Sequence, residues 1–123
     1  DEPILKQLSM KAQKAVKDKG YIKTNLGRRF RFPKDDYGKY MFLNKALNRL
    51  IQGSAADMTK LAMRELWKEG ILPLGCVHDE IDISTSDPKI VARTKQIMEH
   101  ALPLNIPVVV DVSSGNNWGD ASR

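Results

Sequence analysis

Three adjacent ionisable residues, His78, Asp79 and Glu80, lie within the stretch GCVHDEIDIS and are candidates for a catalytic or metal-binding role. The residues around them, including Val77 and Ile81, have the pattern of half-buried strands. Adjacent charges cannot be buried cheaply there without partners. Two carboxylates in a turn offer the hard oxygen ligands that Mg²⁺ prefers, and a turn leaves them accessible to a substrate. An Asp-Glu pair in an exposed turn is also common without any such role.

The small number of cysteines and histidines excludes several other classes of metal-dependent protein. One cysteine, Cys76, and two histidines, His78 and His100, cannot form a Cys/His zinc tetrad or the ligand set of a zinc deaminase. A phosphohydrolase with paired His and Asp needs further histidine ligands, which the sequence lacks. A two-metal nuclease stays open as an alternative. The single cysteine excludes an intramolecular disulfide and fits a reducing, intracellular setting.

Three amide side chains, Asn44, Asn48 and Gln52, are spaced four residues apart and would line one face of a helix. Amides donate and accept hydrogen bonds, which suits minor-groove base edges that present acceptors whatever the sequence. Gly53 and the small residues 54–56 follow, so another backbone could approach the helix closely there. The alternative is a solvated row of amides beside a crossing of small residues.

The stretch LGRRFRF alternates cations with aromatic residues. In a strand, Arg29 and Arg31 would point to one side and Phe30 and Phe32 to the other, because successive side chains alternate. A charged face over an apolar anchor suits contact with phosphates, and Arg28 would add to it. A solvated hairpin is the alternative.

The net charge of +5 is distributed unevenly. Residues 1–40 hold eleven Lys and Arg against five Asp and Glu, whereas residues 71–123 hold four against seven. A basic half that faces a polyanion and an acidic half that faces a cation would suit metal-assisted chemistry on nucleic acid.

No apolar run approaches the roughly 20 residues of a membrane span, and no signal-peptide core is present, so we expect a soluble chain without a membrane partner. Since the sequence begins with Asp1 rather than Met, we expect a piece of a longer protein.

The elements that must position these residues follow from periodicity and turn signals. One domain, 1–123, is expected, with an α+β fold in which helices pack on one face of a small antiparallel sheet. The predicted elements are a helix ending before Gly20, a hairpin over 21–33, a helix from about Tyr40 to Glu69, strands within 71–77 and 81–85, a helix over 88–101, a strand over 106–114 and a polar tail anchored by Trp118.

Together these stretches closely resemble the C-terminal part of family A DNA polymerases, the DNA polymerase I family. The motifs GYIKTNLGRRFRFP, ALNRLIQGSAADMTKLAM, VHDEI and LNIPVVVDVSSGNNWGDA occur in family order and span nearly the whole chain. The resemblance implies the C-terminal segment of a polymerase palm with adjoining fingers-derived helices. It also implies that VHDE is the family's motif C.

Under this resemblance, Asp79 matches the carboxylate that binds catalytic Mg²⁺. Glu80 matches its neighbour with a supporting role at the metal, and His78 matches a residue near the primer 3′ end. The three residues would therefore be tolerated in a hairpin because metal, primer and water satisfy them.

The resemblance also implies DNA contacts. Asn48 and Gln52 match helix residues that touch the minor groove at the newest base pairs, and Arg28 and Arg29 match a basic loop near the DNA. One position departs from the pattern, because Asn44 stands where the family often has arginine.

The implied function is template-directed DNA synthesis in replication or repair, in which dNTPs are added to a primer 3′ end by two-metal nucleotidyl transfer. In the family, the second palm aspartate and the fingers helix that grips the triphosphate lie upstream of the position of Asp1. We therefore expect an upstream polymerase segment or a complementary subunit as partner, besides primer-template DNA and dNTP. The isolated chain would be inactive. We expect it in the cytoplasm or nucleoid of a bacterium or phage-infected cell, or in an organelle. The alternative is a non-catalytic DNA-binding remnant.

Overall fold

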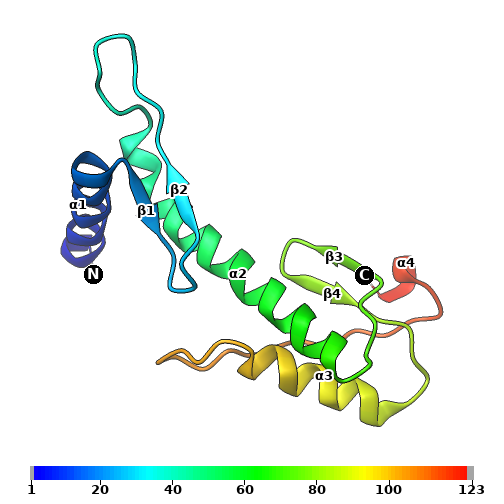
Figure 1. The fold of residues 1–123 in the computed structure, drawn as a ribbon. Coiled ribbons are helices and arrows are strands. Elements are labelled where there is room, and N and C mark those ends of the chain that lie inside the picture. The colour runs from blue at the N-terminus through cyan, green and yellow to red at the C-terminus, as the bar shows by residue number, and fades with distance from the viewer. Residues whose placement is uncertain (1, 122–123) are drawn as a thin grey trace. The chain divides into compact units, whose positions relative to one another are not determined.

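A computed structural model describes residues 2–121 of the chain. These residues fall into two compact units, one that ends at Ala55 and one that begins at Ala56. Figure 1 traces the order of the elements along the chain. Within the described range, no helix is long and apolar enough to cross a membrane.

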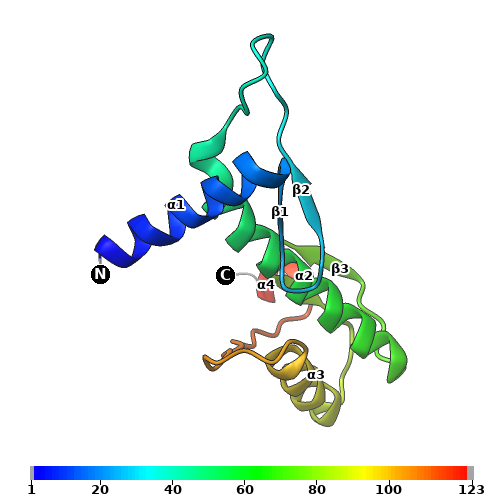
Figure 2. The ribbon, with the colours of Figure 1, turned by 60° about the vertical axis from the view of Figure 1, so that its left-hand side comes forward.

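The N-terminal unit begins with helix α1 (Glu2–Lys19), which leads directly into a hairpin, as Figure 2 shows. The helix ends at Gly20, whose φ of 78° is the left-handed conformation that glycine adopts most easily after a helix. Its N–H donates to the carbonyl oxygen of Val16 at 2.7 Å. A Cβ atom at this position would lie 2.8 Å from the Tyr40 hydroxyl, so the turn also needs a residue without a side chain.

Strands β1 (Tyr21–Lys23) and β2 (Arg29–Arg31) form the predicted antiparallel hairpin, with Ile22 opposite Phe30. The expected alternation is confirmed, because Arg29 and Arg31 are exposed whereas Phe32, one residue beyond β2, is buried.

The core of this unit lies between α1, the hairpin and the start of the following helix. Its buried members are Ala12, Val16, Ile22, Phe32 and Ala46. Only the second half of α1 contributes buried residues to this core. In the first half, Ile4, Leu5 and Leu8 are 61%, 59% and 44% exposed.

The long helix starts later than predicted. A short 3₁₀ turn (Leu43–Lys45) precedes helix α2 (Ala46–Lys68). Phe42 interrupts the helical backbone because its φ is 58°, a left-handed conformation that costs a non-glycine residue roughly 1–2 kcal/mol. Apolar periodicity extends through this point, so the sequence pattern alone did not reveal the break.

The C-terminal unit contains the rest of α2, strands β3 (Gly75–Val77) and β4 (Glu80–Asp82), helix α3 (Pro88–His100) and the short helix α4 (Trp118–Ala121). The predicted start of α3 is confirmed, since the Asp87 side chain caps the helix by accepting from the Lys89 N–H at 2.8 Å, with Pro88 in the first turn. The α+β class is confirmed, and the strands form two separate two-stranded sheets.

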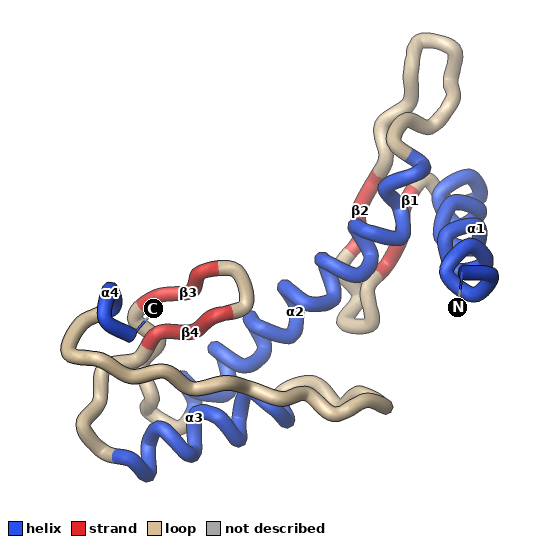
Figure 3. The backbone as a smooth tube through the Cα atoms, turned by 180° about the vertical axis from the view of Figure 1, so that it is seen from behind, coloured by secondary structure: helices blue, strands red, loops and turns tan. Residues whose placement is uncertain are grey.

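The strand predicted over 106–114 is wrong. Figure 3 shows this segment as an extended loop, and no residue in the described range forms a ladder with it. Its run of valines favours an extended backbone, but a strand also needs a partner for its N–H and C=O groups. A hydrogen bond links the segment to α3, in which the Val110 N–H donates to Glu99 Oε1 at 3.0 Å.

Gly53 of α2 supports a prediction about the packing of the hairpin. A Cβ atom there would lie 2.3 Å from Phe30 Cε2 and 3.3 Å from Thr24 Cγ2, so the close approach expected at this glycine is made by side chains. Gly53→Ala should lower the free energy of unfolding by about 1 kcal/mol, because overpacking typically costs 1–3 kcal/mol and outweighs a helix-propensity gain of about 1 kcal/mol. Urea denaturation of the chain measures this change. In a Phe30→Ala background the same substitution should become neutral or stabilising, and an unchanged loss there would contradict the contact.

Candidate functional site

The candidate active-site residues lie at the end of the β3–β4 hairpin. The strands pair Gly75 with Asp82 and Val77 with Glu80, which leaves His78 and Asp79 as the two loop residues. Glu80 therefore lies in β4, one residue outside the turn in which it was expected.

The first of the two loop residues has a left-handed backbone conformation. His78 has a φ of 55°, and Asp79 is not among the residues with positive φ. Positive φ is uncommon for a residue other than glycine, so His78 holds an uncommon backbone conformation. His78 and Asp79 are both exposed at the hairpin end. A two-residue loop has little freedom to move, and it therefore presents the Asp79 carboxylate to solvent from a defined backbone.

The Glu80 carboxylate is held by the C-terminal tail. Its Oε1 accepts a hydrogen bond from the Trp118 indole Nε1 at 3.1 Å, across 38 residues of sequence. Figures 1 and 3 both show α4, which begins at Trp118, beside the β3–β4 hairpin.

Asp82 lies two residues beyond Glu80 and on the same face of β4, because side chains alternate along a strand. Burial raises the pKa of Asp82 above its ordinary value, and a hydrogen bond to Glu80 together with its negative charge raises the pKa further. Gly75 faces Asp82 across the ladder, where a Cβ atom would lie 2.7 Å from Asp82 Oδ2. This face of the hairpin thus brings two carboxyl groups together, and one of them, that of Asp82, lies opposite a glycine.

The donor set of the hairpin suits a hard cation, although it is incomplete. Asp79 and Glu80 supply carboxylate oxygens, and magnesium sites commonly combine one or two carboxylates with substrate phosphates and water. Among residues 2–121, no group of three or more His, Cys, Asp or Glu side chains is arranged to hold a metal ion.

The residues predicted to contact DNA belong to the N-terminal unit. Arg28 and Arg29 are exposed at the end of the β1–β2 loop and the start of β2, and the Arg29 guanidinium lies 4.9 Å from the centroid of the Tyr21 ring. The backbone N–H of Arg28 donates to Thr24 Oγ1 at 3.2 Å, which closes the loop. On α2, Asn48 and Gln52 are exposed, so both amides are accessible to a ligand.

Sequence reasoning missed Arg49, which lies on α2 beside Asn48. Its guanidinium carbon is 4.9 Å from the centroid of the Phe32 ring and 6.0 Å from that of Phe42. The side chain therefore packs the start of α2 against the aromatic residues that precede it. An arginine within a helix that follows several aromatic residues was the only available signal, and it is a weak one.

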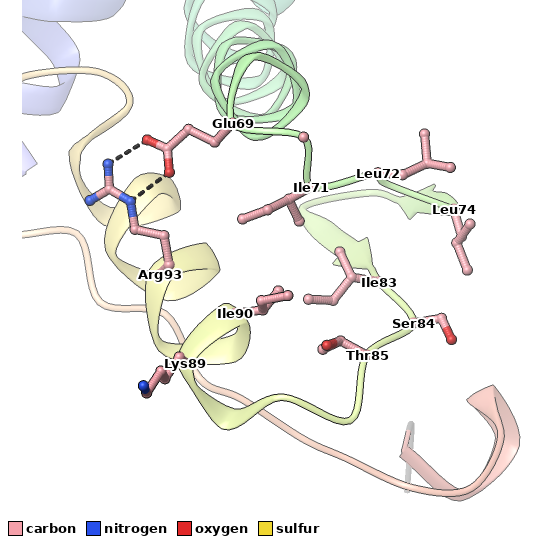
Figure 4. A pocket seen from close by; sticks show the side chains of 11 residues that line it. Glu69, Ile71, Leu72, Leu74, Ile83, Ser84, Thr85, Lys89, Ile90 and Arg93 are labelled. Atoms are coloured by element: carbon pink, nitrogen blue, oxygen red, sulfur yellow. Dashed lines mark hydrogen bonds and ion pairs between the residues drawn. The ribbon is translucent and has the colours of Figure 1, made fainter.

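A separate apolar pocket of about 470 Å³ lies in the C-terminal unit, between the end of α2, the end of β4 and α3 (Figure 4). Ile71, Ile83 and Ile90 line it, and none of residues 78–80 does. At its edge Arg93 forms a two-point ion pair with Glu69. The hydrogen bonds from Arg93 hold the pKa of Glu69 below its ordinary value.

Comparison with known proteins gives one consistent match. The family model described as DNA polymerase family A matches residues 3–120. A DNA-directed DNA polymerase of Pseudomonas phage M6 is 46% identical over 117 residues, which cover 95% of this chain and 18% of the phage protein. DNA polymerase I of Bacillus subtilis strain 168 is 38% identical over 119 residues, covering 86% of this chain and 14% of that protein.

A solved structure shares the fold. It is the POL domain of Pol1 from M. smegmatis in complex with DNA primer-template and dNTP, and it is similar with a TM-score of 0.77 and 30% identity. The match covers 94% of this chain and 23% of that one. The chain therefore spans about a fifth or less of the length of the curated relatives named above.

The raised pKa of Asp82 predicts a pH-dependent stability. Folding disfavours the ionised form of Asp82, because its pKa is raised in the folded chain. The contribution of Asp82 to folding stability is therefore most favourable below the ordinary aspartate pKa, and it is lost as the pH rises through the higher folded pKa. Asp82→Asn should therefore stabilise the chain at neutral pH, and the difference should vanish in acid. Urea midpoints recorded across pH without divalent cations measure this effect. Asp111→Asn, at an exposed position, serves as the control. A variant no more stable than the parent at neutral pH would contradict the prediction.

Proposed function

Because the chain belongs to DNA polymerase family A, we propose that it supplies part of the active site of an enzyme that adds dNTPs to a primer 3′ end on a DNA template. The observation that carries this proposal is the two-residue β3–β4 loop, which presents Asp79 from a defined backbone next to Glu80. The family match supports the reaction class, and the hairpin supports the assignment of residues.

In this proposal Asp79 and Glu80 hold Mg²⁺, and His78 lies near the primer 3′ end. Bound Mg²⁺ would stabilise the charge that develops on the transferred phosphoryl group. Two-metal transfer needs a further carboxylate and cationic groups for the triphosphate. We assign these to a preceding polymerase segment or a partner chain, since the described residues gather no set of three metal ligands.

The N-terminal unit would bind the DNA. Arg28 and Arg29 would contact backbone phosphates, because both are exposed on the hairpin that carries the basic face. Asn48 and Gln52 would donate to the acceptors that every base pair presents in the minor groove. The similar M. smegmatis structure is a complex with primer-template DNA and dNTP, which supports the same ligands here.

The relatives come from bacteria and a bacteriophage, so we place the function in DNA replication or repair inside a bacterial or phage-infected cell.

A non-catalytic DNA-binding module is the second candidate. It is favoured by one observation, namely that the hairpin carboxylates are not joined by a third ligand within residues 2–121.

The DNA-binding part of the proposal predicts weak, sequence-independent binding of duplex DNA. Each neutralised phosphate should contribute a slope of about −0.9 to the dependence of log K on log salt. Arg28→Ala combined with Arg29→Ala should therefore flatten the slope by up to about 2. Fluorescence anisotropy at several salt concentrations measures it. The matched control is Lys11→Ala with Lys14→Ala on α1, which removes the same charge from exposed positions and should change the slope less. Equal changes in both double variants would show that the hairpin is only a solvated surface.

The catalytic part predicts unequal roles for the two carboxylates. The matched 117 residues of the phage M6 polymerase would be replaced by those of this chain, and primer extension would be measured with Mg²⁺. Asp79→Asn should lower kcat by orders of magnitude, because loss of a ligand charge removes several kcal/mol of stabilisation. Glu80→Gln should cost about 10- to 100-fold, as expected for a supporting group.

DNA affinity should survive both substitutions, and the 123-residue chain alone should not extend the primer. A greater loss from Glu80→Gln than from Asp79→Asn would reverse the assignment of the primary ligand. Extension by the isolated chain above that of its Asp79→Ala variant would contradict the need for a completing segment.

A further inference from the structure

The C-terminal tail folds into a self-supporting turn. Asn117 Oδ1 accepts from the Asp120 N–H at 3.1 Å, and Asn117 Nδ2 donates to Asp120 Oδ2 at 2.7 Å. Gly115 lies against the same turn, where a Cβ atom would be 2.7 Å from the Ala121 nitrogen and 2.7 Å from Asp120 Cβ. The backbone at Trp118 is therefore fixed by its own neighbours.

This turn presents the Trp118 indole to the β3–β4 hairpin. The indole N–H is a donor only, and the Glu80 carboxylate accepts it at 3.1 Å. A neutral donor holds one carboxylate oxygen in a single direction without cancelling the negative charge, so the group can still face a cation. The Glu80 side chain has several rotatable bonds, and a bond to a fixed donor restricts the directions it can take.

We propose that Trp118 is a positioning residue for Glu80, so that the C-terminal tail forms part of the β3–β4 site. The inference rests on the proposed function of that hairpin. Partners that orient metal-binding carboxylates typically change activity by about 10- to 100-fold when they are removed, which sets the expected size of the effect.

The contact itself is tested in the 123-residue chain by its two indole N–H signals in ¹H–¹⁵N spectra, one from Trp118 and one from Trp67 on α2. Glu80→Ala should shift the Trp118 signal and speed its exchange with solvent, whereas Asp79→Ala should leave it in place. Trp67 serves as the internal reference in each variant. A Trp118 signal at the position of an unstructured indole, or one insensitive to Glu80→Ala, would overturn the proposal.

A second variant reaches the same contact without altering either partner. Gly115→Ala should displace α4, because the added Cβ atom would collide with its backbone. It should therefore shift the Trp118 signal as Glu80→Ala does. An unchanged signal would show that the turn does not set the position of the indole, which would count against the proposal.

The positioning role is tested in the chimera with the phage M6 polymerase. Trp118→Phe keeps an aromatic ring and removes the N–H, and it should lower kcat about 10-fold with little change in the KM for dNTP. In a Glu80→Gln background the same substitution should have little further effect, because the residue acts through Glu80. Trp67→Phe, an exposed position on α2, is the matched control and should leave kcat unchanged.

The outcomes separate the inference from the function on which it rests. An unsubstituted chimera that fails to extend primers would contradict the proposed function, and the indole signals would still decide the contact. An active chimera in which Trp118→Phe leaves kcat unchanged, or in which its effect and that of Glu80→Gln are independent, would overturn the positioning role alone.

Discussion

The pairing register of the β3–β4 hairpin is the constraint on which the candidate site depends. Because Val77 pairs with Glu80, only His78 and Asp79 remain for the loop, and Asp79 lies at the end of the hairpin. A slip of one residue would send every side chain of β4 to the other face. Glu80 and Asp82 would move to that face together, and Asp82 would no longer lie opposite Gly75. The glycine at position 75 supports this register, because it is the residue that leaves room for the Asp82 carboxyl group on the paired strand.

The same register concentrates negative charge at one face, and the surrounding groups compensate for it in different ways. Asp82 is partly buried beside Glu80, and burial together with the neighbouring Glu80 raises its pKa. Glu80 receives the neutral indole donor of Trp118. Asp79 lies outside this arrangement, exposed in the loop. The two adjacent carboxylates consequently have distinct environments, which is what unequal roles at a metal would require.

In the N-terminal unit, an exposed basic surface depends on buried aromatic residues. Phe32 belongs to the core, and the preceding residue, Arg31, faces solvent on the opposite side of the hairpin. Phe30 packs over Gly53 and so brings the hairpin against α2, the helix that carries the exposed amides. The Arg49 guanidinium stacks on Phe32 as well. The exposed arginines that would contact phosphates therefore lie on a hairpin whose backbone is held in place by these apolar contacts.

The sequence by itself determined the features that depend on neighbours along the chain. Examples are the end of α1 at Gly20, the Asp87-Pro88 start of α3, and the alternation of arginine and phenylalanine in β2, because helix periodicity, caps and strand pleats are local. The ordered motifs also sufficed to identify the family. The roles of Asp79, Glu80 and the DNA-contacting residues stay predictions, since they depend on ligands and not on the local sequence.

Only the tertiary structure decided which half of α1 is packed into the core, because burial depends on what packs against a helix and not on its own sequence pattern. It also showed the left-handed Phe42 that delays α2, and the lack of a ladder partner, within the described residues, for the valine-rich segment over 106–114. The bond between Trp118 and Glu80 joins residues 38 positions apart. No local rule relates such residues, since their meeting depends on how the intervening helix and loops return the chain to the hairpin.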